Sequence, residues 1–445
     1  MASELPEVHY VRAGEVDIAY QVVGAGPIDL VIVPPLVSHL EVEWELGSYA
    51  SFLDRLSSFC RLVRFDKRGM GLSDRIEGAP TLEERMDDLG AVLDDLGLRR
   101  AHLLGISEGG ALALLFAATH PEVVESVSTF AGFARLTAAP DFPEAHPIEF
   151  FRELIAQIEN GWGHGLLLPV VEPAVAGDVE HLRRFGRFER LAGTPGDFRR
   201  CYELALEIDI RAILPLVQAP TLVMQTKGDA IIPVDSGRFV AEHVPNGRFV
   251  TLDGDEHWPW GAAGRAAADT LAEFLVGTPD VISPDRVLAT VLFTDIGDST
   301  RQAADVADRN WRALLDFHDR TSRTEVERQR GRLVKSTGDG VLATFDGPAR
   351  AVRAAMALTK EMAHAGLPIR AGLHTGEIEL RGDDVGGIAV HIAARIAARA
   401  GVGEIIASRT VKDLSIGSGL IFEDHGEHTL KGVPDTWRLY RARVV

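Results

Sequence analysis

Hydrophobic positions in the first 276 residues form short apolar runs of strand length that alternate with helical patterns. After an expected hairpin over residues 8–21, six runs occur, at residues 28–33, 61–65, 101–105, 124–130, 220–225 and 248–252. Continuous apolar runs are typical of strands that are buried on both faces. Strands that alternate with helices predict a mainly parallel, doubly wound α/β sheet for residues 1–276.

The alternation stops between about residues 133 and 210, where the pattern is helical and irregular. One apolar stripe there recurs at helical spacing and comprises Phe150, Phe151, Leu154, Ile155 and Ile158. We therefore expect a helical cap inserted into the first domain. Residues 277–285 are rich in Pro, Gly and Asp, which predicts a linker.

From residue 286 onward the pattern reads strand, helix, hairpin, helix, strand, helix. The last three elements are expected at residues 348–363, 368–374 and 388–400, and this order fits an α+β domain with a ferredoxin-like core over residues 286–445. Asp295 ends the first strand, and Asp339 lies in a Gly-Asp-Gly turn of the hairpin. If the strands lie side by side, the two carboxylates meet, and such oxygen ligands suit Mg²⁺ or Mn²⁺.

Length, charge and cysteine content limit the number of domains, the class of partner and the cellular compartment that are expected. A chain of 445 residues is longer than one hydrophobic core usually supports, so two domains are expected. The formal net charge of -19 argues against nucleic acid or an anionic membrane as a partner. The two cysteines, Cys60 and Cys201, have no metal-ligand spacing, which fits a reducing compartment. The N-terminus lacks the features of a signal peptide, and no apolar run reaches the ~18 residues that span a bilayer. We expect a cytoplasmic protein.

The candidate chemistry of the first domain centres on Ser107, in the sequence Gly105-Ile-Ser107-Glu-Gly109 between a predicted strand and an Ala- and Leu-rich helix. Asp229 and His257 each follow a later strand. A serine is activated when an imidazole takes its proton and a carboxylate orients that imidazole. The order Ser, Asp, His just beyond three strand ends therefore indicates a catalytic triad.

Residues 8–276 resemble the α/β-hydrolase superfamily, and residues 66–73 are another of its recurrent segments. Members usually carry His-Gly after the first buried strand, which helps to form the oxyanion hole. This chain instead has two prolines followed by Leu36, and Pro35 has no amide hydrogen to donate. The backbone amides of Leu36 and Glu108 are the expected donors. Both hydrolysis and a role without turnover, with an unknown small-molecule ligand, remain open.

The second domain resembles the class III nucleotidyl cyclases through residues 293–300 and 335–339. The resemblance implies two Mg²⁺ or Mn²⁺ ions per active site, held at Asp295, Ile296 and Asp339. It further implies in-line attack of the ribose 3′-hydroxyl on the α-phosphate, with release of pyrophosphate. Paired cations would stabilise the attacking and leaving oxygens.

The resemblance also implies which nucleobase the site recognises. Lys335 and Asp384 match the pair that reads adenine, although the neighbouring Asp383 offers a competing register. A lysine can donate to adenine N1 and a carboxylate can accept from the N6 amine, whereas guanine would require the reverse. ATP is therefore expected as the substrate, and cyclic AMP as the product.

The phosphate side of the implied site comprises Arg370 and Lys431, which match contacts to the β- and γ-phosphates, and Arg395, which matches the arginine that stabilises charge on the transferring phosphate. His391 stands where the family usually has asparagine, one turn before Arg395, so that rate and pH dependence can differ.

The family implies a head-to-tail homodimer with two equivalent sites. One subunit supplies Asp295, Asp339 and Arg370, and the other supplies Lys335, Asp384, His391 and Arg395. The pairing of the two domains is similar to a group of actinobacterial, especially mycobacterial, soluble adenylyl cyclases. Our hypothesis is an adenylyl cyclase whose hydrolase-like domain is regulatory or a second catalytic module. The alternatives are a ligand sensor or scaffold with a weak or inactive cyclase domain, and a serine esterase with an accessory cyclase domain.

Overall fold

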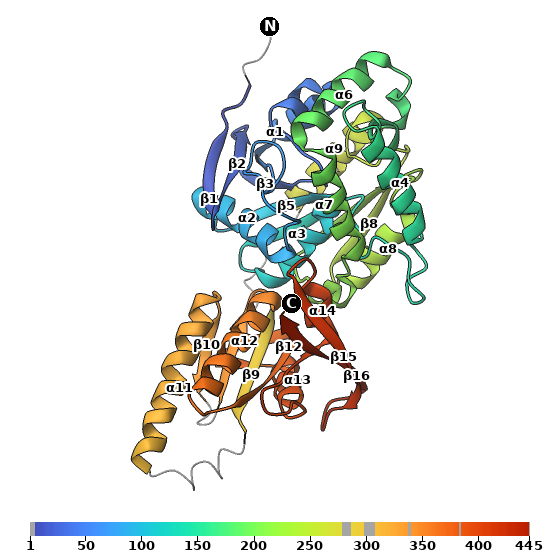
Figure 1. The fold of residues 1–445 in the computed structure, drawn as a ribbon. Coiled ribbons are helices and arrows are strands. Elements are labelled where there is room, and N and C mark those ends of the chain that lie inside the picture. The colour runs from blue at the N-terminus through green and yellow to red at the C-terminus, as the bar shows by residue number, and fades with distance from the viewer. Residues whose placement is uncertain (1–4, 278–285, 298–307, 337–339, 382–383, 445) are drawn as a thin grey trace. The chain divides into compact units, whose positions relative to one another are not determined.

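The computed structural model describes residues 5–277, 286–297, 308–336, 340–381 and 384–444, in two compact units that divide between Pro284 and Asp285 (Figure 1). Residues 278–285 of the predicted linker lie outside the described residues, as do Asp339 and Asp383. None of the described helices combines the length and the hydropathy that crossing a bilayer requires.

The first unit is built on an eight-stranded sheet in the order β1-β2-β4-β3-β5-β6-β7-β8. Strands β3 to β8 are parallel to one another, and β1 and β2 add an antiparallel edge. This confirms the predicted α/β-hydrolase fold, and each of the six predicted strands lies within one residue of its observed bounds. The strands are β1 His9–Ala13, β2 Val16–Val23, β3 Ile28–Val33, β4 Cys60–Phe65, β5 Ala101–Ile106, β6 Val124–Phe130, β7 Thr221–Thr226 and β8 Gly247–Leu252.

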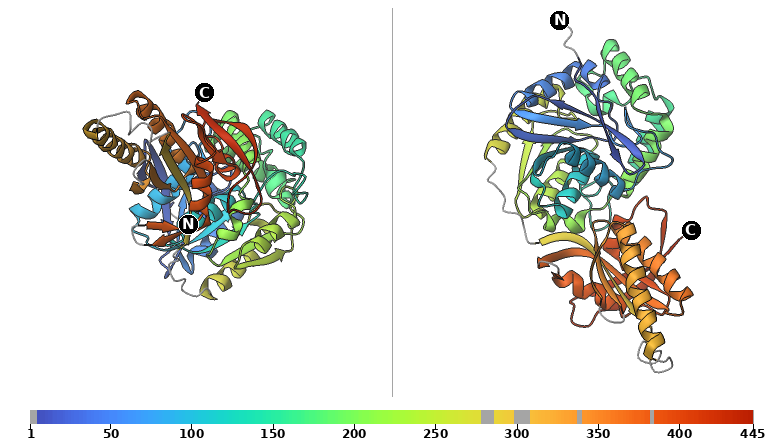
Figure 2. Two further views of the ribbon diagram at one scale, coloured as in Figure 1. Left: turned by 90° about the horizontal axis from the view of Figure 1, so that it is seen from below. Right: turned by 90° about the vertical axis from the view of Figure 1, so that its left-hand side faces the viewer.

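Helices lie on both sides of this sheet (Figures 1 and 2). Because both faces are covered, β5 and β7 are buried along their whole length and β3 is buried over its last four residues, which fits their mainly apolar sequences. The second helix begins with the capping box that Thr81 and Glu84 form: Thr81 Oγ1 accepts from the Glu84 amide, and the Glu84 carboxylate accepts from the Thr81 amide. These helices are α1 Gly47–Ser57, α2 Leu82–Asp95, α3 Glu108–Thr119, α8 Val234–His243 and α9 Gly264–Gly277, with the 3₁₀ turns η1 Val42–Glu45 and η4 Gly261–Ala263.

A set of helices between β6 and β7 forms the inserted cap that the sequence predicts. In the first of them, Phe151, Ile155 and Ile158 are buried, while Leu154 lines a pocket. The cap is pinned internally by the buried Glu189 carboxylate, which accepts three backbone amides of residues 163–167 at 2.7–2.9 Å. The helices are α4 Ile148–Asn160, α5 Leu168–Val171, α6 Val179–Ala192 and α7 Pro195–Glu207, with η2 Pro173–Val175 and η3 Arg211–Leu216.

The second unit contains a sheet in the order β10-β11-β9-β12-β14-β16-β15, with β13 paired to β12. Its first part runs β9, α11, β10, β11, α12, β12, which is the strand and helix order that the sequence predicts. The elements are β9 Arg286–Ile296, α11 Asp308–Arg328, β10 Arg332–Ser336, β11 Val341–Phe345, α12 Pro348–His364, β12 Ile369–Arg381, β13 Asp384–Gly386, α13 Ile388–Ala397, β14 Ile405–Ser408, α14 Arg409–Leu414, β15 Leu420–Thr429 and β16 Thr436–Val444.

Strand β9 is the centre of the second unit's core. Alternate side chains point to opposite faces of a strand, so Leu292 joins the cluster under α12 while Val291 joins the cluster under α13. Two predicted bounds are wrong: the helix from residue 388 ends at Ala397, and the strand from residue 368 continues to Arg381.

Candidate active sites

Ser107 lies at the tight turn between β5 and α3, with φ 53° and ψ -120°. A non-glycine residue in such a conformation costs of order 1–3 kcal/mol and persists only when its surroundings impose it. A Cβ at Gly105 would lie 2.5 Å from the Gly109 carbonyl oxygen, and one at Gly109 would lie 2.2 Å from that of Val33. The two glycines therefore let the chain pack closely enough to present the Ser107 hydroxyl beyond the end of the sheet.

His257 and Asp229 complete a hydrogen-bonded relay with this serine. His257 Nε2 lies 2.9 Å from Ser107 Oγ, and His257 Nδ1 lies 2.9 Å from Asp229 Oδ2. An ionised carboxylate only accepts hydrogen bonds, so Asp229 fixes the proton on Nδ1 and leaves Nε2 free to take the serine proton. Asp229 also accepts from the amides of Ile231 and Ile232 and from the side chain of Gln225. The structure thus brings together the three residues that the sequence singled out.

The two residues expected to donate into the oxyanion hole, Leu36 and Glu108, both line the pocket that holds Ser107. The Glu108 side chain turns to two buried cations: Lys67 Nζ donates to it at 2.8 Å, and Arg85 Nη1 donates to its other oxygen. Glu108 is therefore held by ion pairs beneath the turn, so its backbone is fixed beside Ser107.

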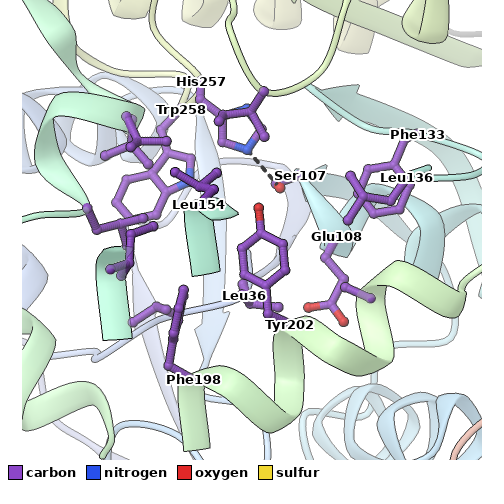
Figure 3. Close-up of a pocket in the computed structure, with 17 residues that line it drawn as sticks. Leu36, Ser107, Glu108, Phe133, Leu136, Leu154, Phe198, Tyr202, His257 and Trp258 are labelled. Carbon is purple, nitrogen blue, oxygen red and sulfur yellow. Dashed lines mark hydrogen bonds between the residues drawn. The ribbon is translucent and has the colours of Figure 1, made fainter. Parts of the chain in front are cut away.

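The pocket above Ser107 is apolar and lies under the cap (Figure 3). It contains about 530 Å³ of space, part of which is open to solvent. Its polar side chains belong to Ser107, Glu108, Tyr202, His257 and Trp258. The remaining lining is hydrophobic and comprises Leu36, Val37, Phe133, Leu136, Leu154, Ile158, Leu167, Val170, Val171, Phe198, Ala205 and Ile231.

In the second unit, Lys335 of β10 and Asp384 of β13 meet although 49 residues separate them. Lys335 Nζ donates to both carboxylate oxygens of Asp384 at 2.8 Å. Both side chains are about half exposed, so the pair adds little to stability and is accessible to a ligand. The alternative register through Asp383 lies outside the described residues.

Asp295 lies at the end of β9, directly opposite Arg370 of β12, whose Nε donates to its carboxylate at 2.8 Å. Ile296 is buried as the last residue of β9. Gly340, the residue after Asp339, packs against the backbone of Thr294 and Asp295, so the two predicted metal-binding segments adjoin. Within the described part of the chain, no three His, Cys, Asp or Glu side chains gather to hold a metal ion.

His391 and Arg395 are exposed one turn apart on α13, and Lys431 is exposed in the turn between β15 and β16. Among the hydrogen bonds and ion pairs of the described residues, none joins these three side chains to the Lys335–Asp384 pair or to the Asp295–Arg370 pair. Their roles in a shared site remain predictions.

Sequence reasoning missed the cap residues that line the pocket, above all Tyr202. Tyr202 follows Phe198 by one helical turn, and this spacing reads only as the apolar face of α7. It also missed the ion pairs beneath Glu108, although consecutive polar residues at 66–68, directly after an apolar strand, were a usable signal.

Comparison with known proteins agrees with this geometry in the first unit. The alpha/beta hydrolase family matches residues 30–270, more than half of the chain. The putative carbamate hydrolase RutD of Caulobacter sp. (strain K31) is 28% identical over 272 residues, which cover 57% of this chain and 92% of that protein. The crystal structure of a hydrolase from Pseudomonas aeruginosa PA01 superposes with a TM-score of 0.51 at 23% identity, covering 62% of this chain and 100% of that one. The adenylyl cyclase CyaB from P. aeruginosa also matches, at a TM-score of 0.34 and 22% identity, covering 36% of this chain and 95% of that one. The chain belongs to the alpha/beta hydrolase family.

Proposed function

We propose that the first unit is a serine hydrolase that cleaves esters of neutral, apolar acyl groups. The observation that carries this proposal is the relay from Asp229 through His257 to Ser107, which opens into an apolar pocket. Ser107 Oγ bonds to the acyl carbon while His257 Nε2 takes its proton, and the carbonyl π electrons move to the oxygen. When the C=O bond re-forms, the alkoxide leaves and takes the proton from His257. Water then repeats the two steps to release the acid.

The lining selects the substrate class. Among the described residues that line the pocket, the one charged side chain besides the triad is Glu108, which is already paired with Lys67 and Arg85, so no free charge is available to bind an ionic acyl group. Burying an unpaired carboxylate among aliphatic and aromatic side chains is costly, whereas burying methylene groups is favourable by about 0.8 kcal/mol each. We expect 4-nitrophenyl butyrate to be a better substrate than the corresponding hemisuccinate ester.

Hydrolysis of these two esters by the full chain tests the proposal. Ser107→Ala should lower turnover of the butyrate by at least about 10³-fold, while Ser51→Ala, on an exposed position of α1, serves as the matched control. Unchanged hydrolysis by Ser107→Ala would refute the assignment. No hydrolysis by the wild type would instead favour the ligand-binding role without turnover.

We also propose that the second unit is an adenylyl cyclase that converts ATP to 3′,5′-cyclic AMP and pyrophosphate. The specific observation in favour is the Lys335–Asp384 pair, which presents a donor and an acceptor together, as adenine N1 and its N6 amine require. In this proposal Arg370 and Lys431 bind the phosphates of ATP, Arg395 stabilises charge on the α-phosphate, and His391 supplies a further hydrogen bond. The pocket would be completed by a second copy of the chain.

Asp295 fits a divalent cation, because its carboxylate is only about one-third exposed, lies at a strand end, and has a hard oxygen donor. Asp295, Ile296 and Asp339 would hold Mg²⁺ or Mn²⁺, which would neutralise the triphosphate and stabilise the attacking oxygen. The residues of the chain would position the base and the phosphates around it.

Cyclic nucleotide production by the full chain, with ATP and GTP in parallel and either metal supplied, tests this second activity. Asp295→Ala should abolish it, Ser107→Ala should leave it intact, and Asp424→Ala on the exposed β15 serves as the carboxylate control. Normal turnover by Asp295→Ala would overturn the assigned metal site. Absence of product from a dimeric wild type would leave the sensor or scaffold alternative.

A further inference from the structure

Tyr202 brings a hydroxyl group from the cap into the pocket of the first unit. It lies on α7, and Figure 3 shows its hydroxyl pointing toward Ser107 and His257 from the opposite wall. Tyr202 is 8% exposed, and its ring packs against Phe198 and Phe151 with centroid distances of 5.5 and 6.3 Å. These contacts fix the direction of the hydroxyl.

This hydroxyl is a donor without a protein acceptor. Among the residues that the structure describes, Tyr202 Oη forms no hydrogen bond, and it borders the pocket, so it can donate to a bound molecule. Burial and the nearby Asp229 charge raise the pKa of Tyr202 above its ordinary value, so the phenol keeps its proton. The other polar groups around it are engaged: His257 in the relay and Glu108 with its two cations.

The oxyanion hole leaves a place for such a donor. Pro35 carries no amide hydrogen, so the backbone supplies at most the amides of Leu36 and Glu108 near Ser107. A third donor from the cap would stabilise the negative charge that develops on the acyl oxygen as Ser107 attacks.

We propose that Tyr202 Oη donates a hydrogen bond to the acyl oxygen of the substrate bound at Ser107. The inference rests on the proposed hydrolase function, since that oxygen belongs to the ester that Ser107 attacks. It makes Tyr202 a catalytic residue supplied by the cap, so the cap contributes to the chemistry as well as to the shape of the pocket.

Tyr202→Phe in the full chain tests the proposal, because it removes the hydroxyl and keeps the ring. We expect kcat/KM for 4-nitrophenyl butyrate to fall about 10²-fold, mainly through kcat, as for loss of one oxyanion donor. Tyr49→Phe is the control: Tyr49 is also buried, but it stacks on Trp260 and lies outside the lining of this pocket. A Tyr202→Phe variant with kcat/KM within about threefold of wild type would overturn the proposal.

A binding measurement tests whether Tyr202 Oη donates to a carbonyl oxygen, without requiring turnover. Calorimetry with 4-phenylbutan-2-one, which has a carbonyl acceptor, should show about five- to tenfold weaker binding to Tyr202→Phe. The hydrocarbon butylbenzene, of similar shape, should bind both proteins equally. Equal affinity of both proteins for the ketone, or an equal loss for ketone and hydrocarbon, would refute the role of the hydroxyl. If the wild type hydrolyses no ester, the proposed hydrolase function fails, and this comparison alone decides the donor role.

Discussion

Replacing Asp229 by Asn is the sharpest test of the relay, because the structure surrounds both carboxylate oxygens with donors. Oδ2 lies 2.9 Å from His257 Nδ1 and accepts from Gln225 Nε2 at 2.8 Å. Oδ1 accepts from the amides of Ile231 and Ile232 at 2.8 and 3.1 Å. An asparagine has one acceptor oxygen and one donor nitrogen, so in either orientation its NH₂ group faces two donors.

The orientation of the new side-chain amide in Asp229→Asn decides whether the variant mainly loses kcat or mainly loses folding stability. If the NH₂ group faces His257, the imidazole shifts its proton to Nε2 and can no longer accept from Ser107, which predicts a fall in kcat of about 10⁴-fold. If it faces the two backbone amides, two buried donors lose their acceptor at about 1–3 kcal/mol each. The first arrangement is favoured, because the imidazole of His257 can move its proton to the other ring nitrogen, whereas a backbone amide cannot change from donor to acceptor.

Steady-state hydrolysis of 4-nitrophenyl butyrate and urea unfolding together measure both effects. We expect kcat to fall about 10⁴-fold with KM within about threefold, and the free energy of unfolding to fall by about 1–3 kcal/mol. Asp253→Asn is the control, because Asp253 is exposed and pairs only with the exposed Lys227 among the ion pairs of the described residues. A kcat within about tenfold of wild type in a folded Asp229→Asn protein would refute the relay as the means by which Ser107 is activated.

The contacts of both units support three further predictions. Glu108→Gln should lower the free energy of unfolding by about 3 kcal/mol, because two buried cations lose their carboxylate; urea unfolding measures this, and a change below about 1 kcal/mol would show that the cations are otherwise stabilised. In the second unit, burial lowers the pKa of His374 to about 4 from 6.5. The stability that its neutral form contributes is therefore complete above pH 6.5, and about 3 kcal/mol of the free energy of unfolding is lost as the pH falls to 4. In urea unfolding between about pH 7 and pH 4.5, His374→Phe should lose correspondingly less stability than the wild type, and an unchanged pH dependence would contradict the assignment. Exchange of the base-reading pair, Lys335→Glu with Asp384→Lys, should reverse the preference for ATP over GTP in cyclic nucleotide production, and a retained ATP preference would remove these residues from base recognition.

The central strands of the first unit were predictable because they are largely buried, as in β5 and β7, and are therefore mainly apolar. In the second unit, β12 runs past its predicted end at residue 374 and through Gly376, although glycine after an apolar run usually marks a strand end. The strand continues through it because Gly376 pairs with Ala289 of β9. A Cβ there would lie 3.1 Å from that of Ala389, so the glycine permits the close approach of α13 to the sheet.

The three residues of the Ser107, His257 and Asp229 relay could be named from the sequence because each follows a strand, and parallel strands bring their carboxyl ends to one edge of the sheet. The pocket could not, because its walls come from the cap, where side-chain packing between helices decides which face turns inward. Phe198 and Tyr202 lie one turn apart on the apolar face of α7, and only the fold shows that both line the pocket and that Tyr202 brings a hydroxyl group to it.

The recurrent segment at residues 66–73 gains a physical reason from its contacts. Asp66 accepts hydrogen bonds from Ser38 Oγ at 2.7 Å and from the Leu40 amide at 3.1 Å, and so holds the loop that carries Leu36. Its neighbour Lys67 holds Glu108 from beneath. Adjacent residues of one segment thus fix the two stretches of backbone to which we assign the oxyanion donors. Because this support acts on the loop after Pro35, it helps to hold Leu36 at the pocket wall, and the donor that we propose from the cap would add to the Leu36 amide without replacing it.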